Sequence, residues 1–200
     1  MDKLLNTTLT HEFYRCTKAF ENFCYQAVNL KSSPSKSDRI DCYNSYVDFL
    51  SHLYEFYLSF IKKELKENKT ETYRIHKLKN IKDQHKKHDI ILNNELRKLL
   101  ENRKKRIMNG FEDNLAKTLD FYNEQFPEKF AEHFRFMRNR RNHSDYKRAS
   151  DNHDISLKDF FKHYHSYVLI MYQEAKWIWK VDIEKYQWNC IEEFATEILE

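Results

Sequence analysis

The sequence predicts an all-α protein, on three observations. Its 200 residues include only one Gly and two Pro, so the residues that break helices and form turns are scarce. Charged residues make up 33% of the chain and aromatic residues 16%. Apolar residues recur at three- and four-residue steps over several long stretches, which is the spacing of an amphipathic helix. A chain of this length can bury a sizeable core, so we expect a single domain, residues 1–200, built as a helical bundle.

The first part of the chain predicts two long antiparallel helices. The first begins near Thr8 or Thr10, either of which can cap it, and ends near Leu30. The second begins near Asp38 and continues for about seven turns. The short Pro/Ser link between them is typical of an antiparallel hairpin. The apolar residues expected to face the core are Phe13, Cys16, Phe20, Phe23, Cys24 and Ala27 in the first helix, and Ile40, Tyr43, Val47, Leu50, Tyr54, Leu58, Ile61 and Leu65 in the second.

The segment 70–110 differs in character, and we interpret it as a basic helical insertion within the domain. It has twelve Lys or Arg residues against five Asp or Glu, a surplus of seven, whereas the whole chain carries a net charge of +4. Its apolar periodicity is poor, and Asn109-Gly110 is a typical helix stop. A solvated helical pair with basic faces accounts for this pattern, and so does an insertion that follows an RNA backbone. The residues predicted to contact RNA are Lys82, Lys86, Lys87, Arg103, Lys104, Lys105 and Arg106.

Four further helical segments are expected after residue 110. A short amphipathic helix reaches Tyr122, and Pro127 suits the first position of the next helix. Ser156 and Asp159 resemble a capping box at the start of a long helix. An acidic amphipathic piece, 182–200, follows it. The residues expected to be buried are Phe130, Phe134 and Met137 in the second of these helices, and Phe160, Tyr164, Val168, Met171, Ala175 and Trp179 in the third.

Composition excludes several classes of function. One Gly is too few for a Gly-rich phosphate loop or a dinucleotide-binding turn, which need several glycines for close backbone approach. The four cysteines show no C-x-x-C spacing, which favours reduced core thiols over a zinc site or disulfides. No apolar run has transmembrane length, and the first residues lack a signal-peptide pattern. We therefore expect a soluble cytoplasmic protein with no membrane partner and no cofactor.

The run Arg138-Asn139-Arg140-Arg141-Asn142-His143 is the strongest candidate for a functional site. It lies at the polar end of the helix that carries the stripe of Phe134 and Met137, and it places an arginine and a histidine with four residues between them. An imidazole can move a proton near neutral pH, and a guanidinium can hold phosphate oxygens. Arg138 and His143 therefore suit metal-free cleavage of RNA, with Asn139 and Asn142 as supporting residues. Arg148 and His153 also fit this spacing, but they lack a leading apolar face, and we interpret them as a chance match.

A helical bundle with an Arg-Asn-x3-His run ahead of a long helix resembles the HEPN superfamily. The resemblance rests on Arg138, Asn139 and His143 and covers about 10–65 and 111–180, which leaves the basic segment outside. It implies a homodimer with a composite, metal-independent ribonuclease site. It also implies a role as a toxin or antiviral defence effector, controlled by an antitoxin or sensor protein. Some toxins of this type carry a modifiable tyrosine in an H-x-Y pattern; here Tyr146 lies one residue further on, so we interpret it as a structural residue.

The chemistry gives an independent reason to expect two copies of the site. Cleavage by the neighbouring 2′-hydroxyl needs a base for the hydroxyl proton, an acid for the departing 5′ oxygen, and a positive charge for the phosphorane oxygens. One imidazole does not readily fill both proton-transfer roles, whereas two copies of His143 across a dimer would. Residues five apart on a regular helix point about 140° apart. Either the helix breaks near Asn142, therefore, or Arg138 and His143 meet across subunits.

Alternatives to catalysis remain open from the sequence. Arg138 can be an interface arginine paired with an acid, with His143 an incidental exposed residue. Asp48 and Glu55 on the second long helix could fix the arginine or the histidine, and salt bridges to Lys62 and Lys63 account for these acids equally well. The protein would then be a non-catalytic HEPN-like module that binds RNA, nucleotide or a partner protein. Metal binding is disfavoured because Lys86 and Lys87 lie between His85 and His88, and because the chain contains no Glu-x-x-His. A DNA-binding regulator would need a compact helix-turn-helix with a Gly-containing turn, which the sequence lacks.

Overall fold

The computed structural model describes residues 3–30, 33–67, 81–112, 119–142, 155–180, 182, 185 and 188–199. The regular elements within these residues are all helical, which confirms the predicted fold class. They are α1 (Lys3–Asn29), α2 (Lys36–Glu67), α3 (Ile81–Met108), α4 (Leu119–Asn123), α5 (Phe130–Asn142), α6 (Leu157–Ile178) and α7 (Asn189–Leu199). Over this part of the chain, no helix has the length and apolar character needed to cross a membrane.

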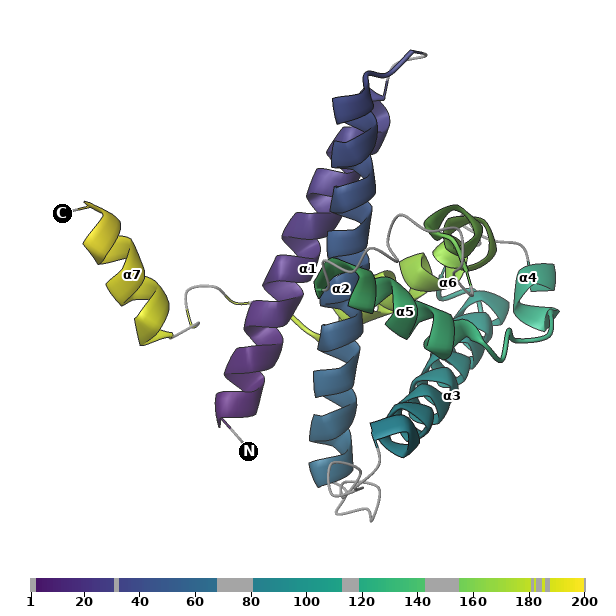
Figure 1. Ribbon diagram of the computed structural model, residues 1–200. Coiled ribbons are helices and arrows are strands. Elements are labelled where there is room, and N and C mark those ends of the chain that lie inside the picture. The colour runs from purple at the N-terminus through teal and green to yellow at the C-terminus, as the bar shows by residue number, and fades with distance from the viewer. Residues whose placement is uncertain are drawn as a thin grey trace.

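The predicted antiparallel hairpin is present as α1 and α2 (Figure 1). Ser35 caps α2: its Oγ accepts from the Asp38 backbone N–H at 3.1 Å, and Asp38 Oδ2 accepts from the Ser35 N–H at 2.8 Å. The expected caps of the first helix are wrong, because α1 already begins at Lys3. Thr8 lies inside it, with its hydroxyl donating to the Leu4 carbonyl at 3.0 Å.

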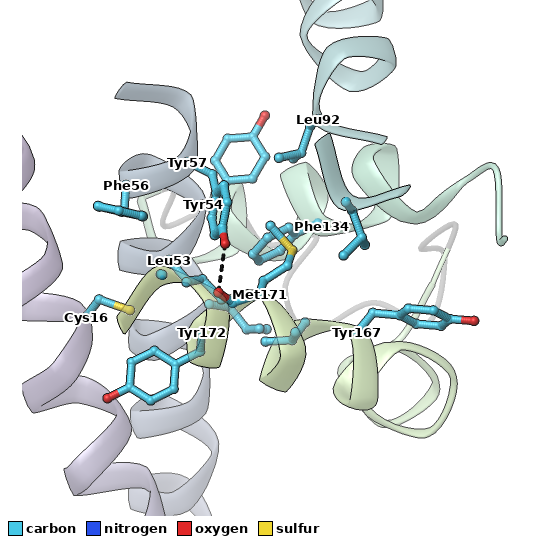
Figure 2. Packing of buried hydrophobic residues seen from close by; sticks show 14 of the residues in the cluster. Cys16, Leu53, Tyr54, Phe56, Tyr57, Leu92, Phe134, Tyr167, Met171 and Tyr172 are labelled. Atoms are coloured by element: carbon cyan, nitrogen blue, oxygen red, sulfur yellow. Dashed lines mark hydrogen bonds between the residues drawn. The ribbon is translucent and has the colours of Figure 1, made fainter. Parts of the chain in front are cut away.

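One apolar core joins α1, α2, α3, α5 and α6 (Figure 2). From α2, Tyr57 is fully buried and donates its hydroxyl to the Met171 carbonyl of α6 at 2.7 Å. The stripe predicted for α5 is confirmed, since Phe130, Phe134 and Met137 are completely buried. The stripe predicted for α6 is confirmed except at its end, where Trp179 lies beyond the helix and is only partly buried. At the hairpin tip, by contrast, the prediction is wrong: Ile40 is 48% exposed. The tip extends beyond the other helices, which leaves its apolar residues without a covering layer (Figure 1).

The segment 70–110 contributes directly to this core. Its described part is α3, which packs on α2, α5 and α6, with Leu92 and Leu96 completely buried. Asn93 also binds the start of α5, as its Oδ1 accepts from the Ala131 N–H at 3.0 Å. Gly110 ends α3 as predicted, with a φ of 72°, and the Phe111 N–H bonds back to the Arg106 carbonyl at 2.9 Å. The basic character of this segment therefore belongs to a helix that is part of the bundle.

In the second half of the chain, one helix start differs from the prediction and another is confirmed. Phe111, just after α3, is 80% exposed. Helix α5 begins at Phe130 rather than at Pro127, whose carbonyl instead accepts from the Phe130 N–H. The capping box of α6 is confirmed, with Ser156 Oγ accepting from the Asp159 N–H at 3.0 Å. Helix α7 lies beyond α1, on the side away from α5, and exposes its apolar face (Figure 1).

Candidate functional site

Arg138 lies on the last turns of α5, where this helix packs on α2. Its guanidinium forms an ion pair with Glu55 of α2: Nε donates to Glu55 Oε1 at 2.6 Å and Nη2 lies 2.5 Å from the same oxygen. Nη1 donates to Asn139 Oδ1 at 3.0 Å. The side chains of Arg138 and Glu55 are 32% and 34% exposed, so water reaches both partners. Of the two acids named from the sequence as candidate partners, Glu55 is the one that binds this arginine.

The contacts that Arg138 makes with described residues do not engage all of its donors. A guanidinium has five N–H bonds, one on Nε and two on each terminal nitrogen. Within the described part of the chain, Nε donates to Glu55, Nη1 donates to Asn139 and Nη2 lies in ion-pair contact with Glu55, which leaves at least one N–H on each terminal nitrogen for another partner. Two adjacent N–H donors match a pair of phosphate oxygens. The guanidinium can therefore hold a phosphate without releasing Glu55.

A second and more deeply buried ion pair lies one turn earlier on α5. Arg135 binds Asp89 of α3 in a bidentate manner, with Nε to Oδ1 at 3.1 Å and Nη2 to Oδ2 at 2.9 Å. Both side chains are largely shielded from solvent. Burial alone would lower the pKa of Arg135, but hydrogen bonding to Asp89 raises it above its ordinary value. Sequence reasoning missed this pair, although the three-residue step from Arg135 to Arg138 places both on one face of the helix.

The remaining residues of the Arg–His run are described only in part. The Arg140 guanidinium donates to the Ile155 carbonyl at 2.6 Å, next to the cap of α6. Helix α5 continues through Asn142, whose side chain, like that of Arg141, is not among those that the structure describes. His143, the predicted catalytic imidazole, lies outside the described residues, and so do Tyr146, Arg148 and His153. Their predicted roles stay predictions.

The basic residues of α3 divide into exposed and internal ones. Lys82, Lys86, Lys87 and Lys105 are exposed, and Lys104 is half-buried. Arg103 is buried: it binds Glu112 at 2.8 Å and donates to Gln173 Oε1 at 2.5 Å.

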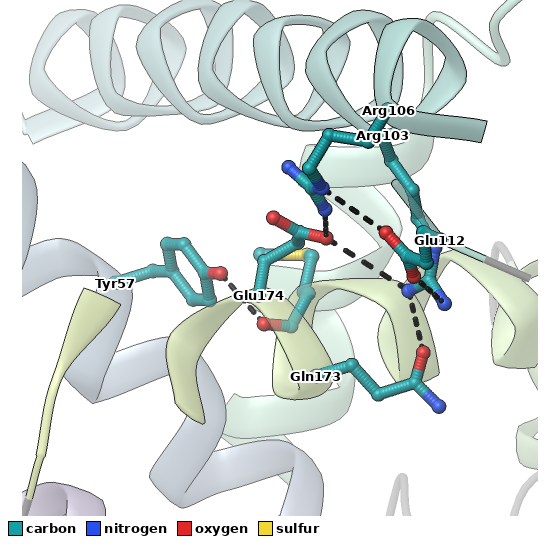
Figure 3. Close-up of polar contacts among 7 residues, drawn as sticks. Tyr57, Arg103, Arg106, Glu112, Gln173 and Glu174 are labelled. Atoms are coloured by element: carbon teal, nitrogen blue, oxygen red, sulfur yellow. Dashed lines mark hydrogen bonds and ion pairs between the residues drawn. The ribbon is translucent and has the colours of Figure 1, made fainter. Parts of the chain in front are cut away.

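Arg106 completes this internal cluster by pairing with Glu112 at 3.0 Å and with the buried Glu174 of α6 (Figure 3). The side chain of Arg103, one of the residues predicted to contact RNA, is enclosed in this cluster between α3 and α6. Arg106 is half-buried and has both of its carboxylate partners within the same cluster.

Two histidines of α6 have local partners. His165 shares a hydrogen bond with Tyr46 at 3.0 Å, and His163 Nδ1 lies 2.7 Å from the Asp159 carbonyl. Within the described ranges, no three His, Cys, Asp or Glu side chains lie grouped as ligands for a metal ion.

Comparison of the chain with models of protein families, with curated proteins and with solved structures finds no match. The functional interpretation therefore depends on the residues and their geometry.

Proposed function

We propose that this protein is a metal-independent endoribonuclease of the HEPN type, acting as a toxin or antiviral defence effector. The observation that carries the proposal is the position, the exposure and the hydrogen bonding of the Arg138 guanidinium. Glu55 and Asn139 fix its guanidinium at the polar end of α5, it is one-third exposed, and its contacts with the described residues leave N–H donors on both terminal nitrogens. A positioned guanidinium that keeps free donors is suited to an anionic substrate, and RNA offers a phosphate at every nucleotide.

In the proposed reaction the 2′-hydroxyl of RNA attacks the adjacent phosphorus. Arg138 holds the phosphate oxygens on which negative charge builds, and His143 transfers a proton near neutral pH. Asn139 orients Arg138 through their hydrogen bond, and Asn142 is the second supporting residue. In a homodimer the two copies of His143 supply the base and the acid, and an antitoxin or sensor protein controls the site.

The test uses purified protein and total RNA. We expect the wild type to cleave RNA with or without a chelator, and the Arg138→Ala and His143→Ala variants to lose cleavage and growth inhibition. The matched controls are Arg148→Ala and His153→Ala, which remove the second Arg–His match and should leave cleavage intact. The Arg138 variant is expected to fold, because an ion pair between partners this exposed is worth about 0–1 kcal/mol. Cleavage that survives in both the Arg138 and the His143 variant contradicts the proposal.

A second candidate function is favoured by the same ion pair. Arg138 bridges α5 to Glu55 of α2, which is the role expected of an arginine at a helix–helix interface in a non-catalytic module. Such a module would bind RNA, nucleotide or a partner protein without cleaving it. Under this alternative, His143→Ala behaves as the wild type, and Arg138→Ala changes binding or stability only.

A further inference from the structure

Helices α3 and α5 pack antiparallel, and their polar contacts fix the register. Asn93 binds the first turn of α5, through Glu128 O at 2.7 Å and the Ala131 N–H at 3.0 Å. Asp89 lies one turn before Asn93 on α3. It binds Arg135, which lies one turn after Ala131 on α5. Side chains three or four residues apart share a helix face. The next step in this register is His85 on α3 and Arg138 on α5.

The electrostatic surroundings of His85 agree with this register. Burial lowers the pKa of its imidazole below the ordinary 6.5, and the positive charge of Arg135 lowers it further. Asp89 opposes that effect, and Arg138 adds to it. The side chain is half-buried, so solvent reaches it, and the charges of both arginines act on it. An imidazole in these surroundings is neutral at neutral pH, which is the form that accepts a proton.

We propose that His85 is the general base of the site that contains Arg138. This inference rests on the proposed ribonuclease function. His85 takes the proton of the 2′-hydroxyl as the 2′ oxygen forms its bond to phosphorus, while Arg138 holds the phosphate oxygens. The bond from phosphorus to the 5′ oxygen breaks, and that oxygen takes a proton from the acid, for which His143 is proposed above. The products are a 2′,3′-cyclic phosphate and a 5′-hydroxyl.

This assignment changes what a dimer must supply. His143 alone needs a second copy of itself, because one imidazole does not readily serve as both base and acid. With His85 as the base, His143 is needed for one proton-transfer role only, that of the acid. No Arg–His motif includes His85, since it lies more than fifty residues before Arg138 in the sequence. The packing of α3 on α5 places the two residues at the same level of the register.

The test compares His85→Ala and His85→Gln with His163→Ala, which replaces an exposed histidine of α6 that pairs with the Asp159 carbonyl of its own helix. The substrate is a short RNA oligonucleotide containing a site that the wild type cleaves. We expect both His85 variants to lose about 100-fold or more in kcat with little change in KM, because general base catalysis contributes roughly 10²–10⁴-fold. His163→Ala should match the wild type. Added imidazole should restore part of the activity of His85→Ala.

The pH profile separates a base from a merely structural residue. The charged groups that face His85 are Arg135 and Arg138 on α5 and Asp89 on its own helix, and Glu55 of α2 lies behind Arg138. Because the pKa of His85 is lowered, wild-type kcat should rise with pH through a limb below about 6.5, and this limb should be absent in His85→Gln.

Three results overturn the inference. The first is a kcat of both His85 variants within threefold of the wild-type value while the Arg138 and His143 variants are inactive. This result would exclude His85 as the base but would leave the proposed ribonuclease function intact. The second is a loss of activity without imidazole rescue and with an unchanged pH limb, which makes His85 structural. The third is the absence of any cleavage by the wild type, in which case the proposed function fails as well.

Discussion

Replacing Arg103 by methionine should destabilise the fold without weakening the affinity of the folded protein for RNA. The guanidinium is 8% exposed, and one of its partners, Glu174, is 6% exposed. Removing one partner of a buried ion pair costs about 3–5 kcal/mol, because the other charge stays buried. For Arg103→Met, the loss in the free energy of unfolding should be about 3 kcal/mol, at the lower end of this range. Arg106 still pairs with Glu174 in the variant, and Arg103 Nε has no acceptor in the described part of the chain.

The assay is urea unfolding followed by circular dichroism, with Lys105→Met as the matched control on the same helix. Lys105 is exposed, so its replacement should change the free energy of unfolding by no more than about 0.5 kcal/mol. For a chain of this size, the loss in the Arg103 variant corresponds to a fall in Tm of about 6–12 °C. An Arg103 variant as stable as the Lys105 variant, but with weaker RNA binding when folded, would refute the assignment of this arginine to the internal cluster.

Three further predictions follow from local contacts. Leu96→Ala should lower the free energy of unfolding by about 2–5 kcal/mol in urea titrations, because this side chain of α3 is completely buried in the core. A loss below about 1 kcal/mol would contradict its place in the core. Ser35→Ala should cost about 1 kcal/mol in the same titration, since it removes the cap of α2, whereas an unchanged midpoint would show that the cap contributes nothing. In thiol labelling, exposed Cys190 should react in the native protein, whereas Cys16 should react only after unfolding, because burial removes access and raises the pKa of its thiol; native labelling of Cys16 is the contrary result.

The apolar periodicity predicted which face of each helix is buried but not how far the covering helices extend. Phe130 and Phe134 are buried as expected, because α5 is a short helix that crosses α2 and packs on it (Figure 1). Ile40 belongs to a stripe of the same kind, yet it is exposed because the tip of the hairpin extends beyond the other helices. A periodic pattern is a local property, whereas the extent of a neighbouring helix depends on the whole chain.

The poor periodicity of α3 has a physical cause that the sequence could not reveal. Polar residues occupy inward positions of this helix: Arg103 binds Glu112 beside α6, and Asn93 binds the first turn of α5. Inward polar residues look like a solvated face in the sequence, because their partners lie on other elements. Charge counting identified a basic segment but could not separate the internal arginines from the exposed lysines.

The candidate site shows the same division between local and long-range information. Arg138 was predicted from a local run, and its partner Glu55 was one of two acids considered on α2. The placement of His85 on the face of α3 that packs on α5 depends instead on Asp89 and Asn93, which belong to no motif and fix the register of the two helices. A shift of one residue along α3 would turn His85 by about 100° away from the shared face. The buried pair of Asp89 and Arg135 therefore determines whether His85 and the arginine of the motif lie at the same level of the two helices.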